Sequence, residues 1–299
     1  MNVTPTLIAE KLRHVSPFWY KLGAQAYIDK TYPRHLFIET TSACNLSCSY
    51  CPRERRTNEM EFGLFKDIVT EASHYGSRSF SLHLFGEPTL YRYWKQAIRF
   101  IKDTRRTNTV LLTTNGTRLN SIVDDLTQSG VDKVIWTWRP EAVFTPETKE
   151  KLRKWGKFMV RLIEEITPKH AYEEWGEWKP QERKSLHNYG ATIDTSLFRK
   201  EESGAVNVPA GSSMERWPCY HLWLAPAVAW NGNILMCCND PHQKEVLGTF
   251  PQMTVAQAWQ SDRLKMIRES HLKGEYGGIC KGCDSWRTYP DIFFKRQRR

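Results

Sequence analysis

The sequence predicts an α/β fold: a partial (β/α)6 TIM-like barrel followed by a small C-terminal domain made of a β-hairpin plus a helix. Two observations lead to this prediction. From residue 36 onward, short runs rich in β-branched and aromatic residues alternate with amphipathic stretches of helical length. Repeated units of this kind form parallel sheets. After residue 217 the pattern changes to short strands, turns and clustered cysteines, which indicates a second architecture.

Six strands and the helices between them account for the barrel. The expected strands cover residues 36–41, 80–85, 110–114, 131–138 and 158–163, with a sixth near 189–193. The expected helices cover residues 62–75, 93–103, 120–129 and 148–155. We therefore divide the chain into an N-terminal helical cap (1–34), a barrel (35–205) and a C-terminal domain with a basic tail (206–299).

The composition indicates a cytoplasmic protein that uses its cysteines for metal chemistry. No stretch has the length and apolar character of a signal peptide or a membrane span. Eight cysteines in a chain of 299 residues favour thiolate ligands over the disulfides of short secreted proteins. The net charge of +10 favours an anionic partner only weakly, since the clearest basic cluster, residues 295–299, is expected to be a solvated tail.

Three cysteines, Cys44, Cys48 and Cys51, lie within eight residues directly after the first expected strand. Three thiolates from one loop can ligate three irons of a [4Fe-4S] cluster and leave the fourth iron open for another ligand. The alternative is a structural zinc site, which usually has a fourth ligand close by in sequence. Here the next cysteine is Cys219 and the next histidine is His74. We therefore favour the cluster over zinc.

Two polar segments follow the second and third expected strands. They are Gly86-Glu87-Pro88 and Thr114-Asn115-Gly116. The carboxyl ends of parallel strands meet at one edge of a sheet, so both segments are expected beside the cysteine loop. Either segment alone is also a common turn sequence.

A second group of cysteines occurs in the C-terminal part of the chain. Two short strands around Asn231-Gly232 are expected to form a hairpin, followed by a helix over residues 255–269. Four thiols lie around these elements: Cys219, Cys237, Cys280 and Cys283. Four thiolates can saturate one metal centre, and the spacing alone does not separate zinc from iron–sulfur.

The cysteine loop resembles the signature loop of the radical S-adenosylmethionine (SAM) superfamily, which has a CxxxCxxC spacing and an aromatic residue, here Tyr50, before the last cysteine. Gly86-Glu87-Pro88 resembles the GGEP-type motif of that family, with Phe85 in place of a first glycine, and Thr114-Asn115-Gly116 resembles its TNG segment. The resemblance implies that the first motif receives the amino group of SAM. It also implies that Thr114 and Asn115 face its ribose or carboxylate and that Tyr50 lies beside the adenine.

The C-terminal cysteine pattern resembles the auxiliary-cluster module called SPASM or, when shortened, twitch. The resemblance assigns Cys219, Cys237, Cys280 and Cys283 to one auxiliary [4Fe-4S] cluster. Cys238 is expected to be a neighbouring thiol, although Cys237 and Cys238 could exchange roles. Three charged residues near strand ends are candidates for substrate or ribose contacts, or are simply solvated: Arg139, Arg161 and Glu164.

The resemblance implies a radical SAM enzyme with two [4Fe-4S] clusters, which cleaves SAM reductively to a 5′-deoxyadenosyl radical and abstracts hydrogen from a substrate carbon. An electron donor such as flavodoxin or ferredoxin is implied. The outcome could be oxidation, epimerisation, rearrangement or cross-linking of a peptide or small molecule, and no residue chooses among them. One alternative is radical SAM modification of a nucleotide or nucleic acid. An alternative of another class is a non-enzymatic zinc protein that binds nucleic acid.

Overall fold

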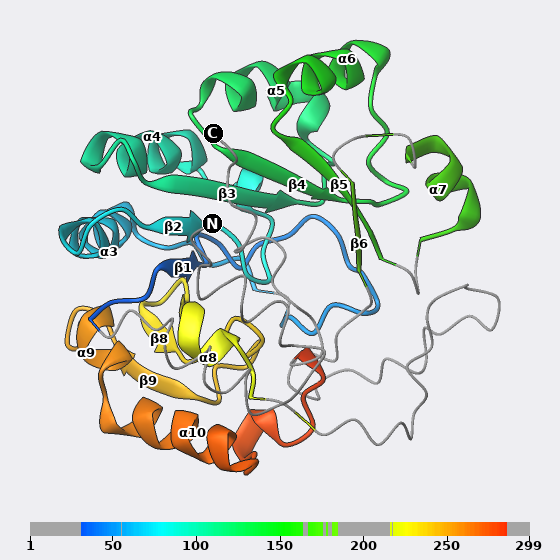
Figure 1. Cartoon of the computed structure of the whole chain (residues 1–299). Helices are drawn as coiled ribbons and strands as arrows, with labels where there is room; N and C mark the ends of the chain where they lie inside the picture. The colour runs from blue at the N-terminus through cyan, green and yellow to red at the C-terminus, as the bar shows by residue number, and fades with distance from the viewer. Residues whose placement is uncertain are drawn as a thin grey trace, which may run out of the picture.

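A single twisted sheet organises the computed structural model, which describes residues 31–54, 56–163, 167–175, 178, 181–184, 216 and 218–285. The described sheet has nine strands in the order β6-β5-β4-β3-β2-β1-β7-β8-β9. Strands β1 to β6 are mutually parallel, as the strand and helix alternation predicts. Figure 1 shows helices α3 to α6 along one side of this parallel part. No helix in the described part of the chain is long and apolar enough to cross a membrane.

Strands β1 to β5 lie in the interior of the sheet and are largely buried, and β6 lies at the edge of the described sheet. The barrel strands are β1 (His35–Ile38), β2 (Ser79–Ser81), β3 (Thr109–Thr114), β4 (Lys133–Thr137), β5 (Phe158–Ile163) and β6 (Gln181–Lys184). The sequence interpretation extended β2 to residue 85, but the backbone leaves the sheet after Ser81. The sixth strand of the structure is at Gln181–Lys184, and the strand expected near 189–193 lies outside the described residues.

Helices follow the strands and bury one apolar face against the sheet. They are α3 (Phe62–His74), α4 (Trp94–Thr104), α5 (Leu119–Gln128), α6 (Pro146–Trp155) and α7 (Lys169–Trp175), with a 3-10 turn η1 (Pro88–Leu90) before α4. Helix α6 shows why such segments stop where they do. The Thr145 hydroxyl accepts a hydrogen bond from the Thr148 amide at 3.1 Å, and Gly156 ends the helix at φ +71°.

The C-terminal elements continue the barrel sheet. They are α8 (His221–Leu224), β7 (Ala227–Val228), β8 (Asn233–Leu235), β9 (Val246–Thr249), α9 (Val255–Trp259), α10 (Asp262–Lys273) and the 3-10 turn η3 (Gly278–Cys280). Strand β7 pairs in parallel with β1, and β8 and β9 are antiparallel additions. The expected hairpin around Asn231-Gly232 is present. This hairpin joins the barrel sheet, because β7 pairs with the edge of β1 that β2 leaves free.

One expected helix is two helices. Residues 255–269 were predicted as a single segment, but α9 ends at Trp259 and α10 begins at Asp262. The Ser261 hydroxyl accepts a hydrogen bond from the Leu264 amide at 3.3 Å and so caps a new N-terminus. The Thr254 and Gln257 side chains form a capping box on α9.

The loop after β2 passes against the end of β1 with no room for a side chain. A Cβ atom on Gly86 would lie 1.9 Å from the carbonyl oxygen of Thr41 and 2.9 Å from that of Ala43. Both neighbours are backbone atoms, so the clash would not be relieved by a side-chain rotation. The amide of Glu87 donates to the carbonyl of Ala43 at 2.7 Å. The ends of β1 and β2 are therefore in direct backbone contact.

Gly86→Ala is expected to destabilise the fold by about 1–3 kcal/mol, because a methyl group must displace backbone in a packed region. Thermal unfolding of the anaerobically prepared protein measures this. The matched control is Gly63→Ala in α3, where nothing lies within 4 Å of a new Cβ. That change should be neutral or stabilise by up to about 1 kcal/mol. Equal unfolding temperatures for the two variants would contradict the close approach at Gly86.

Candidate active site

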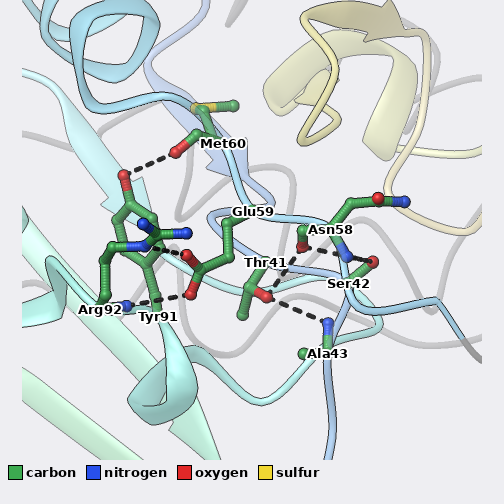
Figure 2. A network of polar contacts seen from close by, with 8 residues as sticks. All are labelled: Thr41, Ser42, Ala43, Asn58, Glu59, Met60, Tyr91 and Arg92. Carbon is green, nitrogen blue, oxygen red and sulfur yellow. Dashed lines mark hydrogen bonds and ion pairs between the residues drawn. The ribbon is translucent and has the colours of Figure 1, made fainter.

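The cysteine loop leaves β1 and is closed at its base by pairing of residues 40–42 with 58–60. The amide of Ser42 donates to the Asn58 carbonyl at 2.9 Å, and the Asn58 amide donates back to the Ser42 hydroxyl at 3.0 Å. Figure 2 shows this pairing together with the Thr41 hydroxyl, which donates to the same carbonyl at 3.0 Å. The thiols therefore lie on a loop with a fixed base.

Residues 59 and 60, at the base of the cysteine loop, form hydrogen bonds with the two residues Tyr91 and Arg92 that precede α4. The Tyr91 hydroxyl donates to the Met60 carbonyl at 2.9 Å, and the Arg92 amide donates to the Glu59 carboxylate at 3.1 Å (Figure 2). Arg92 also forms an ion pair with Glu59 through its side chain. Tyr91 is buried, so this tie is part of the core. The loop base is thereby connected to the loop that follows β2.

Arg53 holds the cysteine loop from within. Its guanidinium donates to the carbonyl oxygens of Cys44 at 3.2 Å and Leu46 at 3.0 Å. Sequence reasoning did not select this residue, because an arginine two positions after the last cysteine has no distinctive pattern. Its role follows from the geometry, since it fixes the backbone on which the first thiol sits.

The three loop thiols are partly exposed and free. The Asn115 side-chain amide donates to the Cys44 sulfur at 3.7 Å and to the Asn45 side chain at 2.9 Å. Burial raises the pKa of Cys51. Three accessible sulfur donors on one loop fit a cluster that keeps one iron open, which is the expectation from the sequence.

Glu87 is buried, with 2 % of its surface exposed, and accepts four hydrogen bonds. Its Oε1 receives the Thr89 amide at 3.2 Å and the hydroxyls of Thr89 and Thr114, each at 2.7 Å. Its Oε2 receives the Asn115 amide at 2.7 Å. Burial raises the pKa of Glu87, while these donors favour the charged form. The carboxylate joins the ends of β2 and β3. The sequence interpretation had instead expected the segment that contains Glu87 to contact the amino group of SAM.

The three polar strand ends converge as expected. Asn115 connects the end of β3 to the cysteine loop, and its carbonyl accepts a hydrogen bond from the Trp136 indole at 3.1 Å. Asn45 also donates to the Thr117 hydroxyl at 2.8 Å, a contact that the sequence did not indicate. Pro88 is buried in η1, where the Pro-Thr-Leu turn follows Glu87.

Tyr50 lies beside one of the charged candidates. The guanidinium carbon of Arg139 is 5.0 Å from the centroid of the Tyr50 ring, a cation–π distance. Arg161 is on β5. Glu164 lies outside the described residues. The structure thus brings Arg139, at the end of β4, to the cysteine loop.

The second group of thiols lines one small cavity of about 20 Å³ between α8, the segment after β8, and η3. Its walls include the four expected ligands, Cys219, Cys237, Cys280 and Cys283. Burial raises the pKa of Cys219 well above its usual value, and burial with the nearby Cys237 raises that of Cys280 to about 12. Buried thiols such as those of Cys219 and Cys237 resist ionisation unless a cation compensates their charge. The donor set therefore fits a metal centre.

Cys238 is placed differently from Cys237. Cys237 faces the cavity, and its sulfur accepts the Asn239 amide at 3.3 Å. The Cys238 sulfur lies 3.7 Å from the Nδ1 atom of His221, and it packs with the apolar cluster beside Phe37. The ligand atoms of His221, Cys237 and Cys238 all lie within 4.8 Å of one another. This arrangement favours Cys237 as the cavity ligand.

Two family models match the chain. The model described as the radical SAM superfamily covers residues 38–135, which include the cysteine loop and the ends of β1, β2 and β3. The model described as an iron–sulfur cluster-binding domain, SPASM, covers residues 219–284, which include all four thiols of the cavity. The two models imply the same cofactors as the sequence interpretation, SAM and two [4Fe-4S] clusters.

Characterised relatives are similar over different lengths. The S-adenosyl-L-methionine-dependent 2-deoxy-scyllo-inosamine dehydrogenase of Niallia circulans is 24% identical over 256 residues, which cover 83% of this chain and 91% of that protein. The GTP 3′,8-cyclase of Chlorobaculum tepidum is 33% identical over 100 residues, 32% of this chain and 30% of that protein. The first similarity thus spans both parts of the chain, and the second spans a third of it.

Solved structures share the fold. BtrN in complex with AdoMet and 2-DOIA superposes with a TM-score of 0.62 at 22% identity, covering 84% of this chain and 92% of BtrN. The anSMEcpe structure with bound AdoMet superposes with a TM-score of 0.57 at 17% identity, covering 84% of this chain and 88% of anSMEcpe. Streptococcus suis SuiB bound to the precursor peptide SuiA superposes with a TM-score of 0.51 at 17% identity, covering 87% of this chain and 71% of SuiB.

These matches agree with the geometry of both thiol groups and confirm the sequence interpretation of the family and of the α/β partial barrel. They also favour iron–sulfur over zinc, because the model for residues 219–284 is that of a cluster-binding domain. The chain belongs to the radical SAM superfamily and is an enzyme with a C-terminal SPASM-type iron–sulfur cluster-binding domain.

Proposed function

We propose that this enzyme oxidises an alcohol group of a small hydroxylated molecule, using SAM bound beside the cysteine loop. The observation that carries the proposal is the convergence of the polar ends of β2 and β3 on a loop with three free thiols, with a second thiol-lined cavity in the same sheet assembly. The similarity to the Niallia circulans dehydrogenase extends over both parts of the chain and supports this substrate class.

The ligand assignment follows the two thiol groups. Cys44, Cys48 and Cys51 hold the cluster with an open iron. The four cavity thiols, Cys219, Cys237, Cys280 and Cys283, hold the auxiliary cluster. When bound, a reduced cluster with an open iron would supply the electron that cleaves SAM, and the resulting 5′-deoxyadenosyl group would take one hydrogen atom from the carbon that bears the hydroxyl. The auxiliary cluster would accept the second electron and solvent the hydroxyl proton, which completes the oxidation to a carbonyl.

The chain's own residues fix the place of SAM. The Glu87 carboxylate accepts the Thr89 and Asn115 amides and the Thr114 hydroxyl, and so it fixes the segment after β2 against the end of β3. We assign the backbone carbonyls of the Gly86-Glu87-Pro88 segment to the amino group of SAM. Thr114 and Asn115 border the ribose and carboxylate. Tyr50, backed by Arg139, lies beside the adenine. Holding these groups in advance lowers the entropy cost of binding.

A second candidate, the modification of a nucleotide, is favoured by one specific similarity. The GTP 3′,8-cyclase of Chlorobaculum tepidum and proteins named probable GTP 3′,8-cyclases are 31–36% identical over 32–41% of the chain, and the net charge of +10 suits a phosphorylated substrate. These similarities cover less of the chain than that of the dehydrogenase. Peptide substrates are a further option within the same fold, since SuiB was solved with a precursor peptide.

We also propose a small electron-transfer protein, such as flavodoxin or ferredoxin, as the electron donor, and the cytoplasm as the location. All eight cysteines are free in the structure. A reducing compartment keeps such thiols available for clusters. The three-part division of the chain at residues 34 and 205 stays a prediction, and the second boundary lies outside the described residues.

The reconstituted protein is expected to contain two [4Fe-4S] clusters and, when reduced with dithionite, to convert SAM to 5′-deoxyadenosine and methionine. Cys48→Ala should abolish this conversion and keep about half of the iron, because the auxiliary ligands lie on other elements. Iron, sulfide and zinc assays with chromatography of the nucleoside check both points. Stoichiometric zinc without SAM cleavage would contradict the function, and loss of all iron in Cys48→Ala would contradict two independent sites.

Cys237→Ala is expected to remove the auxiliary cluster, and Cys238→Ala to retain it, because Cys237 faces the cavity and Cys238 faces His221. Electron paramagnetic resonance separates the two sites when both changes are made in a protein whose three loop cysteines are already alanine. The reverse pattern of signals would assign the ligand to Cys238.

Glu87→Gln is expected to lower stability by about 1–3 kcal/mol, because a glutamine NH2 group would face hydrogen-bond donors in a buried place. The displaced loop should weaken SAM binding by about tenfold or more. The control is Glu71→Gln, since Glu71 accepts the amides of Val255 and Ala256 at the start of α9, away from the cysteine loop. Titration of SAM at matched iron content decides: equal affinity in wild type and Glu87→Gln would remove Glu87 from the site.

A further inference from the structure

A cavity of about 130 Å³ lies where the cysteine loop meets the C-terminal hairpin. We call it the seam cavity. The returning part of the cysteine loop contributes Arg53 and Arg56, and the C-terminal part contributes Trp230 and His242. The volume is enough for several water molecules or for one end of a small polar ligand. Its walls therefore come from both cluster-binding parts of the chain.

Glu39, the residue after β1, lines this cavity and is 5% exposed. Its carboxylate accepts the Trp230 amide at 3.4 Å and a hydrogen bond from the Phe85 amide. The Glu39 amide donates to the Val228 carbonyl of β7 at 2.9 Å, so its backbone belongs to the sheet ladder. The carboxylate is thus held in a fixed place by two backbone amides and faces the cavity.

The cationic groups that line the seam cavity are already occupied. Arg53 donates to backbone carbonyls of the cysteine loop, and Arg56 forms an ion pair with Glu54. The Nδ1 atom of His242 lies 3.3 Å from the same Glu54 carboxylate. Within the described part of the chain, neither arginine forms an ion pair with Glu39. The cavity therefore contains one buried carboxylate whose charge is not balanced by these cations.

The titration of Glu39 agrees with this description. Burial raises the pKa of Glu39 to about 7, although the two backbone amides act in the opposite direction. A buried carboxylate that lacks a cation is partly protonated near neutral pH. A cationic ligand placed beside it would lower this pKa again and release the proton.

We propose that the seam cavity binds a protonated amine of the hydroxylated substrate, with Glu39 as its anionic partner and with the Trp230 and Phe85 rings as the apolar walls. This inference rests on the proposed function, which it extends from a hydroxylated molecule to one that carries an amine. A carboxylate in a partly desolvated place beside aromatic rings suits an ammonium group.

The position of the cavity suits a substrate site. Its walls belong to the loop with Cys44, Cys48 and Cys51 and to the segment that follows Cys237 and Cys238. Phe85 precedes the Gly86-Glu87-Pro88 segment, which we assign to SAM. A ligand anchored by its amine at Glu39 therefore lies next to the proposed SAM site, with its remaining groups free to extend away from the cavity.

Calorimetric titration of the cluster-loaded, SAM-bound protein tests this inference. The probes are 2-deoxy-scyllo-inosamine, which carries the amine, and deoxy-scyllo-inositol (scyllo-quercitol), which has a hydroxyl in its place. We expect the amine to bind at least tenfold more tightly and to release protons at pH 7, measured in two buffers of different ionisation enthalpy. Its affinity should fall by up to about tenfold per pH unit below 7, because protonated Glu39 loses its charge.

Glu39→Gln should weaken binding of the amine probe by about tenfold or more and remove the proton release, while Glu71→Gln should change neither. Equal affinity in Glu39→Gln, or no proton release in wild type, would overturn the role of Glu39. Absence of binding of both probes to wild type would overturn the amine class. SAM cleavage measured in the same samples keeps the two proposals apart: if cleavage is intact while amine binding fails, only the inference on the seam cavity is wrong.

Discussion

The buried carboxylate of Glu87 is the interaction on which the arrangement of the site depends. It accepts hydrogen bonds from Thr89, Thr114 and Asn115, and so it joins the end of β2 to the end of β3. The Glu87 amide reaches the cysteine loop at Ala43. Removing a buried acceptor would leave several donors without partners, which costs more than each hydrogen bond contributes. One residue, through its side chain and its amide, thereby keeps three strand ends in a single geometry.

The sequence was sufficient for much of this result because the relevant signals are local. Alternating strand and helix patterns predicted the parallel sheet, and the order of Cys44, Glu87 and Asn115 predicted which ends meet. Long-range hydrogen bonding could not be inferred. Nothing in the sequence pattern shows that the Glu87 carboxylate accepts hydrogen bonds from β3, that Arg53 donates to carbonyls of the cysteine loop, or that Asn45 donates to Thr117. The capping Ser261 was a local signal and could have indicated the break between α9 and α10.

The electrostatics of the two thiol groups differ in a way that follows from burial. Cys219 and Cys237 are buried, and their pKa values are raised well above the usual range, the first by burial and the second by the Cys238 thiol and burial. The thiols of the cysteine loop are more exposed. A cavity lined by two buried and two partly buried thiols suits a closed, saturated coordination sphere, whereas a partly exposed loop leaves one side open to a second ligand.

The pairing of β1 with β7 also limits how the two parts of the enzyme can move. A hydrogen-bonded ladder between adjacent strands has no hinge, so the C-terminal part and the cysteine loop are held in a fixed relative position. Glu39 adds a side-chain tie across the same junction, to the amide of Trp230. The sheet therefore fixes the spacing between the two groups of thiols. A change of substrate preference has to come from the side chains and connecting segments that line the junction.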